Sequence, residues 1–179
     1  MKTKTRILLA MLLPLLYLTQ ACDDPKTSKK YNDETAVDVA GLHFMENVAD
    51  AGLTEIKAAK VAEKISTNPR VVGFAKMMIT DHTAVDEKLT KLRKTENVDA
   101  TTDIDKAHEA MIDSLSKMSG PAFDKAYMEM MVDGHKEAVD LFRQGKENRA
   151  NAVQSFAAEY LPTIGMHLDS AKAILASLK

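Results

Sequence analysis

Apolar residues alternate at spacings of three and four positions along most of the chain after residue 33, and this spacing constrains the fold more than any other feature. Positions 75, 78, 82, 85, 89 and 92, for example, read Ala, Met, His, Val, Leu and Leu. Such spacing places apolar side chains in a stripe along one face of an α-helix, where they pack against neighbouring helices. The pattern therefore predicts an all-α protein made of long helices.

Four long helices are expected, over residues 33–66, 69–94, 121–146 and 150–178. Asn68 precedes Pro69, and Pro121 follows Gly120, so two of these segments carry a proline in the first helical turn. Amides in that turn have no hydrogen-bond partner within the helix, so the missing amide hydrogen of proline costs nothing there. Pro162 lies inside the last segment and is expected to kink it.

The connection between the second and third long segments is unusually long. Residues 95–120 are polar at first and then carry a short amphipathic pattern over 104–118. A connection of this length can cross the height of a bundle and begin the third helix at either end. The prediction is a four-helix bundle with a crossover that contains a short extra helix.

Residues 1–21 are typical of a secretory signal peptide. Three basic residues precede an apolar run from Ile7 to Leu18, and the small residue Ala21 closes the segment. The run is too short to span a bilayer, which takes about 20 residues, and Pro14 interrupts it. The segment predicts a protein exported to the cell envelope.

Cys22 is the only cysteine, and its place after Ala21 resembles the lipidated position of a bacterial lipobox. Lipidation would remove a thiol that is a liability in an oxidising compartment. We expect residues 22–32 to form a lipidated, flexible tether for a domain over 33–179, which faces the periplasm from the outer or inner membrane. The alternative is an ordinary secretory peptide with an incidental cysteine.

The charge balance excludes one class of partner. The chain has a formal charge of −2, and removal of the three basic residues in the signal segment leaves −5. The sequence has no lysine- and arginine-rich stripe with interleaved aromatic residues. Nucleic acid is therefore not an expected partner. The membrane is an expected partner through the lipid anchor, and the sequence identifies no protein partner.

Each long segment carries one ionisable residue within its apolar stripe: Glu55, His82, His135 and His167. Antiparallel helices have equal heights at equal distances from a shared turn, so Glu55 and His82 should face each other. The same count leaves His135 and His167 offset by a few residues, unless a longer turn or the Pro162 kink levels them.

Three imidazoles and a carboxylate that converge inside a bundle are a suitable ligand set for zinc, iron or copper. Met78 and Met131 lie one turn before two of the histidines, and their thioethers would favour copper(I). Asp81 and Asp169 are candidates to orient the imidazoles as hydrogen-bond acceptors.

Two other interpretations of this set stay open. Buried histidines often bond only to a carboxylate or a free carbonyl, which would make the set a structural polar network, and the set could also line a ligand pocket without metal. His43 and His108 lie at the borders of their stripes and are expected at the surface or its boundary.

The residues around the histidines resemble a bacterial family known as domain of unknown function 4142. The similarity rests on three motifs in order: Val71–Thr83, then Phe123–Tyr127 with Met131–His135, and finally Phe156-Ala157 with Leu161-Pro162 and His167-Leu168. The resemblance implies a ferritin-like four-helix bundle and an envelope location, and it supplies no activity. Glu55 also falls where the first helix of the family has a Glu-Val or Glu-Ile step.

The comparison with ferritins has a chemical limit. Di-iron members use two Glu-x-x-His motifs, whereas Ile79, Val132 and Ile164 stand three residues before the histidines here. A di-iron oxidase or iron store is therefore not supported. We expect a non-catalytic, lipid-anchored envelope protein whose inner Glu and His residues form a polar core able to bind a single transition metal. The alternatives are a periplasmic metal-dependent redox or peroxide-handling enzyme and an envelope-stress interaction module.

Overall fold

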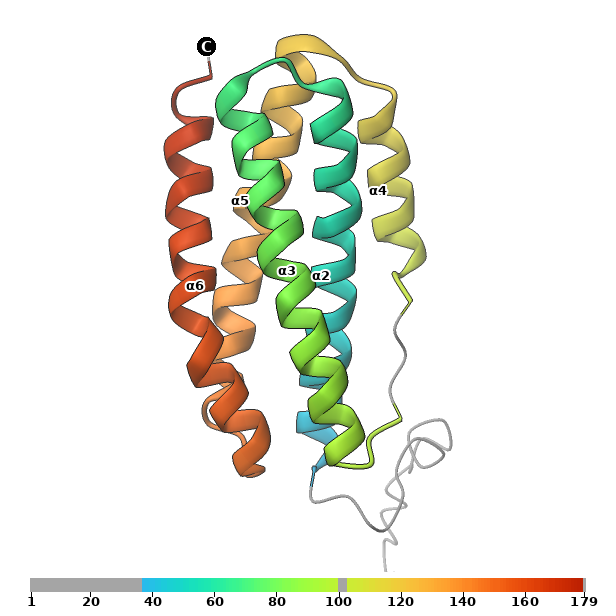
Figure 1. Cartoon of the computed structure of the whole chain (residues 1–179), viewed down its shortest axis with the longest axis vertical. Helices are drawn as coiled ribbons and strands as arrows, with labels where there is room; N and C mark the ends of the chain where they lie inside the picture. The colour runs from blue at the N-terminus through green and yellow to red at the C-terminus, as the bar shows by residue number, and fades with distance from the viewer. Residues whose placement is uncertain (1–36, 100–102, 179) are drawn as a thin grey trace, which may run out of the picture.

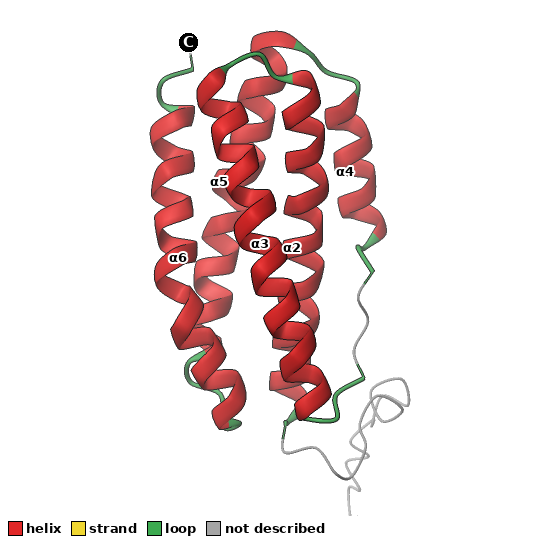
Figure 2. Ribbon diagram, viewed as in Figure 1, coloured by secondary structure: helices red, strands yellow, loops and turns green. Residues whose placement is uncertain are grey.

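The computed structural model describes residues 37–99 and 103–178, and within them the chain forms helices and turns without a strand (Figure 2). The helices are α2 (Val39–Ile65), α3 (Pro69–Thr95), α4 (Lys106–Ser116), α5 (Gly120–Gly145) and α6 (Asn151–Leu175). The all-α prediction is confirmed. The expected signal segment, Cys22 and the tether lie outside the described residues.

The four long helices form two antiparallel hairpins, α2 with α3 and α5 with α6 (Figure 1). Helix α2 also packs against α5, and α3 packs against α6. The crossover carries α4 back along the outside of the bundle, so that α5 begins at the same end as α3. This up-down-down-up order is that of a ferritin-like four-helix bundle, and it settles the direction that the length of the connection had left open.

Two predicted helix ends differ from the observed ones. Helix α2 begins at Val39 instead of residue 33, because the extended Asp38 caps it and accepts a hydrogen bond from the amide of Gly41 at 2.8 Å. Helix α6 ends at Leu175, three residues before the predicted end, and the chain continues in a turn. Pro162 lies near the middle of α6, where Figure 1 shows the helix axis bending.

One end of the core is packed by aromatic rings. The rings of Phe44 and Phe142 lie 5.4 Å apart edge to face, and those of Phe44 and Phe156 lie 6.2 Å apart. Gly145 lets the last turn of α5 approach these rings, because a Cβ atom there would stand 2.5 Å from Cε2 of Phe44. The absence of a side chain at this position therefore sets the distance between α2 and α5.

The other end is held by a buried hydrogen bond. The hydroxyl of Ser66, in the turn after α2, donates to Oδ1 of Asp124 on α5 at 2.5 Å, and both residues are buried. This bond to a charged acceptor ties the α2–α3 turn to the start of α5.

Helix α4 packs on α2 and, more lightly, on α5. Asp50 on α2 holds it through two contacts: Oδ2 lies 2.8 Å from Nδ1 of His108, and Oδ1 accepts a hydrogen bond from the amide of Asp105 at 2.9 Å. Among the residues that the structure describes, no helix is long and apolar enough to cross a membrane.

Candidate metal centre

The four inward ionisable residues come together in the middle of the bundle, one from each long helix. Glu55 on α2 and His82 on α3 are each 5% exposed, His135 on α5 is fully buried, and His167 on α6 is 1% exposed. These side chains lie in the interior of the bundle, as the apolar spacing predicted.

Glu55 contacts two of the three imidazoles. Its Oε2 lies 3.0 Å from Nε2 of His82, and its Oε1 lies 3.1 Å from Nδ1 of His135. The first contact follows from the equal distances of these residues from the α2–α3 turn. The second joins α2 to α5, and the residue count had not predicted it.

The three imidazole rings form a compact triangle. Their centroids are separated by 5.6 Å for His82 and His135, 5.5 Å for His82 and His167, and 5.4 Å for His135 and His167. His135 and His167 therefore lie side by side, which is the second of the two arrangements that the residue count had left open. One ligand atom from each ring lies within 4.8 Å of the others.

Each of these imidazoles keeps one buried nitrogen without a hydrogen-bond partner in the described residues: Nε2 of His82, Nε2 of His135 and Nδ1 of His167. Of these three, Nε2 of His82 also faces Oε2 of Glu55 at 3.0 Å. Nδ1 of His135 lies 2.9 Å from the carbonyl oxygen of Met131 and faces Glu55, so this nitrogen carries the proton. Its Nε2 then has a free lone pair.

The two aspartates proposed to orient imidazoles behave differently. Oδ2 of Asp81 lies 3.0 Å from Nε2 of His167, which places the proton on Nε2 and leaves Nδ1 as an acceptor. Asp169 is exposed and makes no contact with a histidine among the described residues. Only Asp81 therefore has the predicted orienting geometry.

The charges of these residues depend on one another. Burial by itself raises the pKa of Glu55, but attraction to His82 and His135 outweighs it and holds this pKa well below its usual range. Burial lowers the pKa of His135, and the Glu55 carboxylate outweighs that effect, so the pKa is raised. Burial lowers the pKa of His167, and the opposing hydrogen bond to Asp81 is too weak to reverse it. Glu55 is therefore an anion that attracts positive charge to this centre.

Met78 and Met131 are fully buried on α3 and α5, one turn before His82 and His135. The other two histidines lie outside the centre: His43 is exposed, and His108 is partly exposed beside Asp50. Their positions agree with the boundary assignment from sequence.

Two polar residues near the centre were missed from sequence. Tyr127 is fully buried, its hydroxyl has no partner in the described residues, and burial together with the charge of Glu55 raises its pKa. The hydroxyl of Thr54 is likewise buried without such a partner. Tyr127 could have been found, because it lies within the broad apolar face of its helix about two turns before His135.

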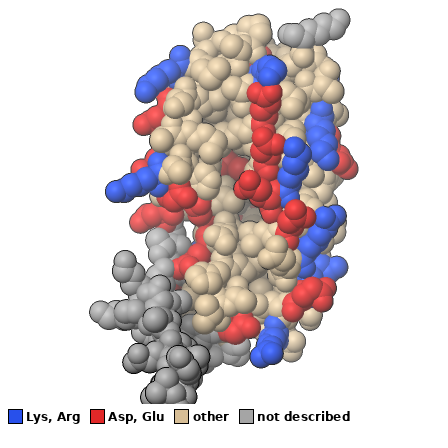
Figure 3. All heavy atoms as spheres, turned by 180° about the vertical axis from the view of Figure 1, so that it is seen from behind, with Lys and Arg blue, Asp and Glu red and all other residues tan. Residues whose placement is uncertain are grey.

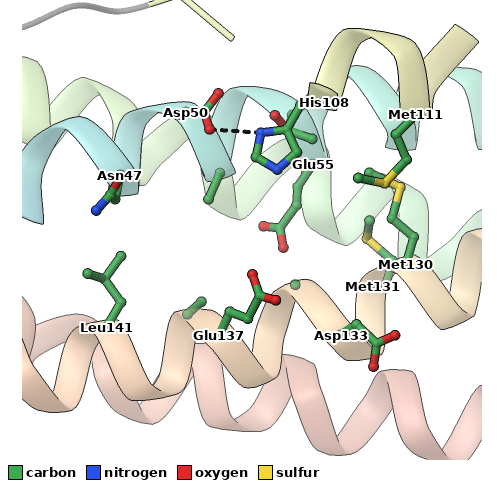
Figure 4. A pocket seen from close by; sticks show the side chains of 14 residues that line it. Asn47, Asp50, Glu55, His108, Met111, Met130, Met131, Asp133, Glu137 and Leu141 are labelled. Carbon is green, nitrogen blue, oxygen red and sulfur yellow. Dashed lines mark ion pairs between the residues drawn. The ribbon is translucent and has the colours of Figure 1, made fainter. Parts of the chain in front are cut away.

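A cavity of about 470 Å³ lies between α2, α4 and α5 beside the centre (Figure 4). Glu55 lines it, and Figure 4 shows this side chain extending from α2 towards α5. The carboxylate that holds two imidazoles is thus also next to a space that opens to the surface.

Sequence comparison decides the family of the chain. The profile described as Domain of unknown function (DUF4142) matches residues 26–174, which contain all four residues of the candidate centre. The chain belongs to the DUF4142 family. The predicted resemblance to this family is confirmed, and the DUF4142 description assigns no activity. No curated protein matches the sequence.

Two solved structures share the fold of this DUF4142 chain. A DUF305 fragment from Deinococcus radiodurans has 14% sequence identity and a TM-score of 0.71, and the match covers 79% of this chain and 99% of that one. A DUF305 protein from Streptomyces coelicolor, described as secreted, has 11% identity and a TM-score of 0.67, with 77% and 91% covered. At these identities the likeness supports the helical-bundle fold alone.

Proposed function

We propose that this protein binds a single transition metal ion in the middle of its bundle through His82, His135 and His167, with Glu55 as the neighbouring anion. The observation that carries the proposal is the triangle of imidazoles, each with a buried nitrogen that has no hydrogen-bond partner in the described residues. Three imidazole nitrogens and one position for a carboxylate or water are a suitable set for zinc, copper or iron.

A purely structural polar network accounts less well for these nitrogens. Buried polar atoms are nearly always hydrogen-bonded, because an unpaired one costs about 1–3 kcal/mol. Here Glu55, Asp81 and a backbone carbonyl contact one nitrogen of His135 and of His167, which leaves Nε2 of His135 and Nδ1 of His167 buried without a partner in the described residues. A metal ion would satisfy both nitrogens, and Nε2 of His82, which faces Glu55, would complete the set.

The neighbouring residues would prepare the imidazoles for this role. With the protons of His135 and His167 on the nitrogens that face Glu55 and Asp81, the lone pairs are on the opposite nitrogens. Glu55 would also offset part of the charge of the ion. The fit rests on side chains from four helices, so the metal would bind only the assembled bundle.

The location that we propose is the cell envelope, with Cys22 as the lipid attachment site. The support is the signal-like segment before this cysteine and the flexible composition of residues 23–32. Several acyl chains, at ~0.8 kcal/mol for each buried methylene, would anchor the protein without a spanning helix. Mass spectrometry of the membrane fraction tests this: a diacylglyceryl mass on Cys22 supports it, and a mature chain with a free thiol rejects it.

Calorimetric titration of metal-stripped protein with zinc and with copper tests the metal proposal. We expect binding of one ion per chain that is lost in His82→Ala, His135→Ala and His167→Ala. The matched control is His43→Ala, since His43 is exposed on the first turns of α2 and should leave binding unchanged. Absence of binding, or binding that survives all three core substitutions, would reject the proposal.

The cavity gives a second candidate its specific support. A metal-dependent enzyme that handles peroxide or other oxygen species requires a route for its substrate, and the cavity beside Glu55 is open to the surface. Turnover of peroxide by the metal-loaded protein that is lost in His135→Ala would favour this activity. A loaded protein without turnover would leave metal binding as the function.

A further inference from the structure

The cavity between α2, α4 and α5 reaches from the surface to Glu55, which lies beside the three histidines of the candidate metal centre. Asp50, Thr54 and Glu55 line it from α2, and Glu137 lines it from α5. Figure 3 shows a hollow on this side of the molecule next to a row of acidic side chains. Since Glu55 is 5% exposed, it forms the inner end of the cavity, and the exposed Glu137 lies at the mouth.

The charge of the lining favours a cation. Four carboxylates and His108 line the cavity, and no lysine or arginine does. Asp50 pairs with His108 and Asp133 pairs with Lys136. Glu137 makes no ion pair among the described residues, and Figure 4 shows it pointing into the space that Glu55 also faces. The hydroxyl of Thr54, 3% exposed and without a hydrogen-bond partner there, is a further oxygen on the lining. A positive ion would gain from this site, whereas an anion would be repelled.

Three thioethers on the same lining narrow the class of cation. Met111 comes from α4, and Met130 and Met131 come from α5. Figure 4 shows all three at one end of the cavity. Met111 is 41% exposed, so this side chain of the lining is within reach of solvent. Thioethers are soft ligands that select ions such as copper(I) over zinc.

We propose that this cavity is the access site through which a thiophilic metal cation of the copper(I) class reaches the three histidines. The acidic mouth at Glu137 would attract the ion, the three thioethers would hold it, and Glu55 would pass it inwards, since its oxygens lie 3.0 Å from His82 and 3.1 Å from His135. This inference rests on the proposed metal centre.

Gly134 keeps the inner end of the cavity open. It lines the cavity on α5, and a Cβ atom there would stand 3.2 Å from Oε1 of Glu55, tighter than ordinary contact. Gly134→Ala should therefore restrict the carboxylate and slow the transfer of the ion without removing any ligand.

Rates of metal binding test the route separately from the centre itself. Stopped-flow tyrosine fluorescence can follow the association of silver(I) and of zinc(II). Silver(I) stands in for copper(I), because it has the same charge and similar softness and keeps one oxidation state. We expect Met111→Leu/Met130→Leu to slow silver(I) roughly tenfold and leave the zinc(II) rate unchanged, because only the soft ion uses the thioethers. Glu137→Gln should slow both ions by about threefold at low salt.

Matched variants on other surfaces control for general effects. Met166→Leu changes a methionine that is 55% exposed on α6, and Glu147→Gln changes an exposed acid in the α5–α6 turn; neither should alter a rate. Equilibrium zinc affinity, equal to that of the unchanged protein, shows that the double methionine variant retains its fold and its centre.

The outcomes separate the two proposals. Absence of metal binding in the unchanged protein overturns both the centre and the route. Binding with wild-type rates in the Met111/Met130, Glu137 and Gly134 variants overturns the route alone. Equal slowing of silver(I) and zinc(II) by the methionine substitutions overturns the selection of a thiophilic ion.

Discussion

The carboxylate of Glu55 lies between two histidines of different helices, with Oε1 3.1 Å from Nδ1 of His135. Glu55→Gln keeps the shape of this side chain and removes its charge. We expect the metal-free protein to lose about 3 kcal/mol of its free energy of unfolding at neutral pH, the lower end for removing one partner of a buried pair, because the hydrogen bond from Nδ1 of His135 to a charged acceptor is lost. Urea denaturation measures this loss.

Glu63→Gln is the control for that measurement, since Glu63 is an exposed acid on the same helix. Its substitution should change stability by no more than about 0.5 kcal/mol. Equal losses in the two variants would show that Glu55 makes no special contribution to the core.

Acid should weaken the metal-free protein through His167. Burial lowers the pKa of His167 in the folded state, so the unfolded chain binds its proton more readily. The stability contributed by the neutral ring is complete above the unfolded pKa of about 6.5 and is lost as the pH falls below it, towards the folded pKa. The pKa of His135 is raised, so its contribution to stability changes only above about pH 6.5. Below that pH the contribution is constant and does not affect the slope.

Denaturation of His167→Gln at several pH values between about 5 and 6.5 tests this assignment. The variant should lose less stability on acidification than the unchanged protein, whereas His43→Gln, at an exposed position, should behave like the unchanged protein. Parallel pH profiles for all three proteins would contradict a role for His167.

Gly145 and Gly73 should respond in opposite directions to alanine. At Gly145 the added methyl group would stand 2.5 Å from Phe44 and 2.9 Å from Ala157, and such overpacking costs about 1–3 kcal/mol. At Gly73, also helical, a methyl group would meet nothing within 4 Å, so the better helix propensity of alanine should add up to about 1 kcal/mol. Thermal unfolding of both variants measures the contrast, and similar shifts would count against the close approach of α5 to Phe44.

Metal should stabilise the folded protein in proportion to its binding. At a free concentration one hundred times the Kd, an ion that binds only the native state adds about 2.7 kcal/mol to the free energy of unfolding. The gain should vanish in His135→Ala and persist in Met166→Leu, as judged by urea denaturation with and without zinc. Equal stabilisation of both variants would indicate binding elsewhere on the chain.

The bundle and the members of the centre could be predicted from sequence because both depend on helical periodicity. An ionisable residue in an otherwise apolar stripe must lie inside, and that reasoning located Glu55, His82, His135 and His167. The distance from a common turn was enough to pair Glu55 with His82, since a short turn fixes the register of two helices. It was not enough for His167, because the turn before α6 and the bend in that helix shift its level.

Other features depend on how separate parts of the chain pack. The cavity exists because α4 lies on α2 and α5, and nothing in the pattern of α4 states which helices it covers. Likewise, Asp124 at the start of α5 accepts a hydrogen bond from Ser66, which lies in the turn after α2. Such long-range contacts leave no local signal in the sequence.

The crossover has a consequence for the order of events during folding. Each hairpin brings only two corners of the centre together, and Asp81 and His167, 86 residues apart, meet only when both hairpins have docked. A partly synthesised or clipped chain that lacks α6 therefore has an incomplete ligand set. Metal retention would then act as a check on completeness, and an ion lost from the centre would mark a chain whose two halves have separated.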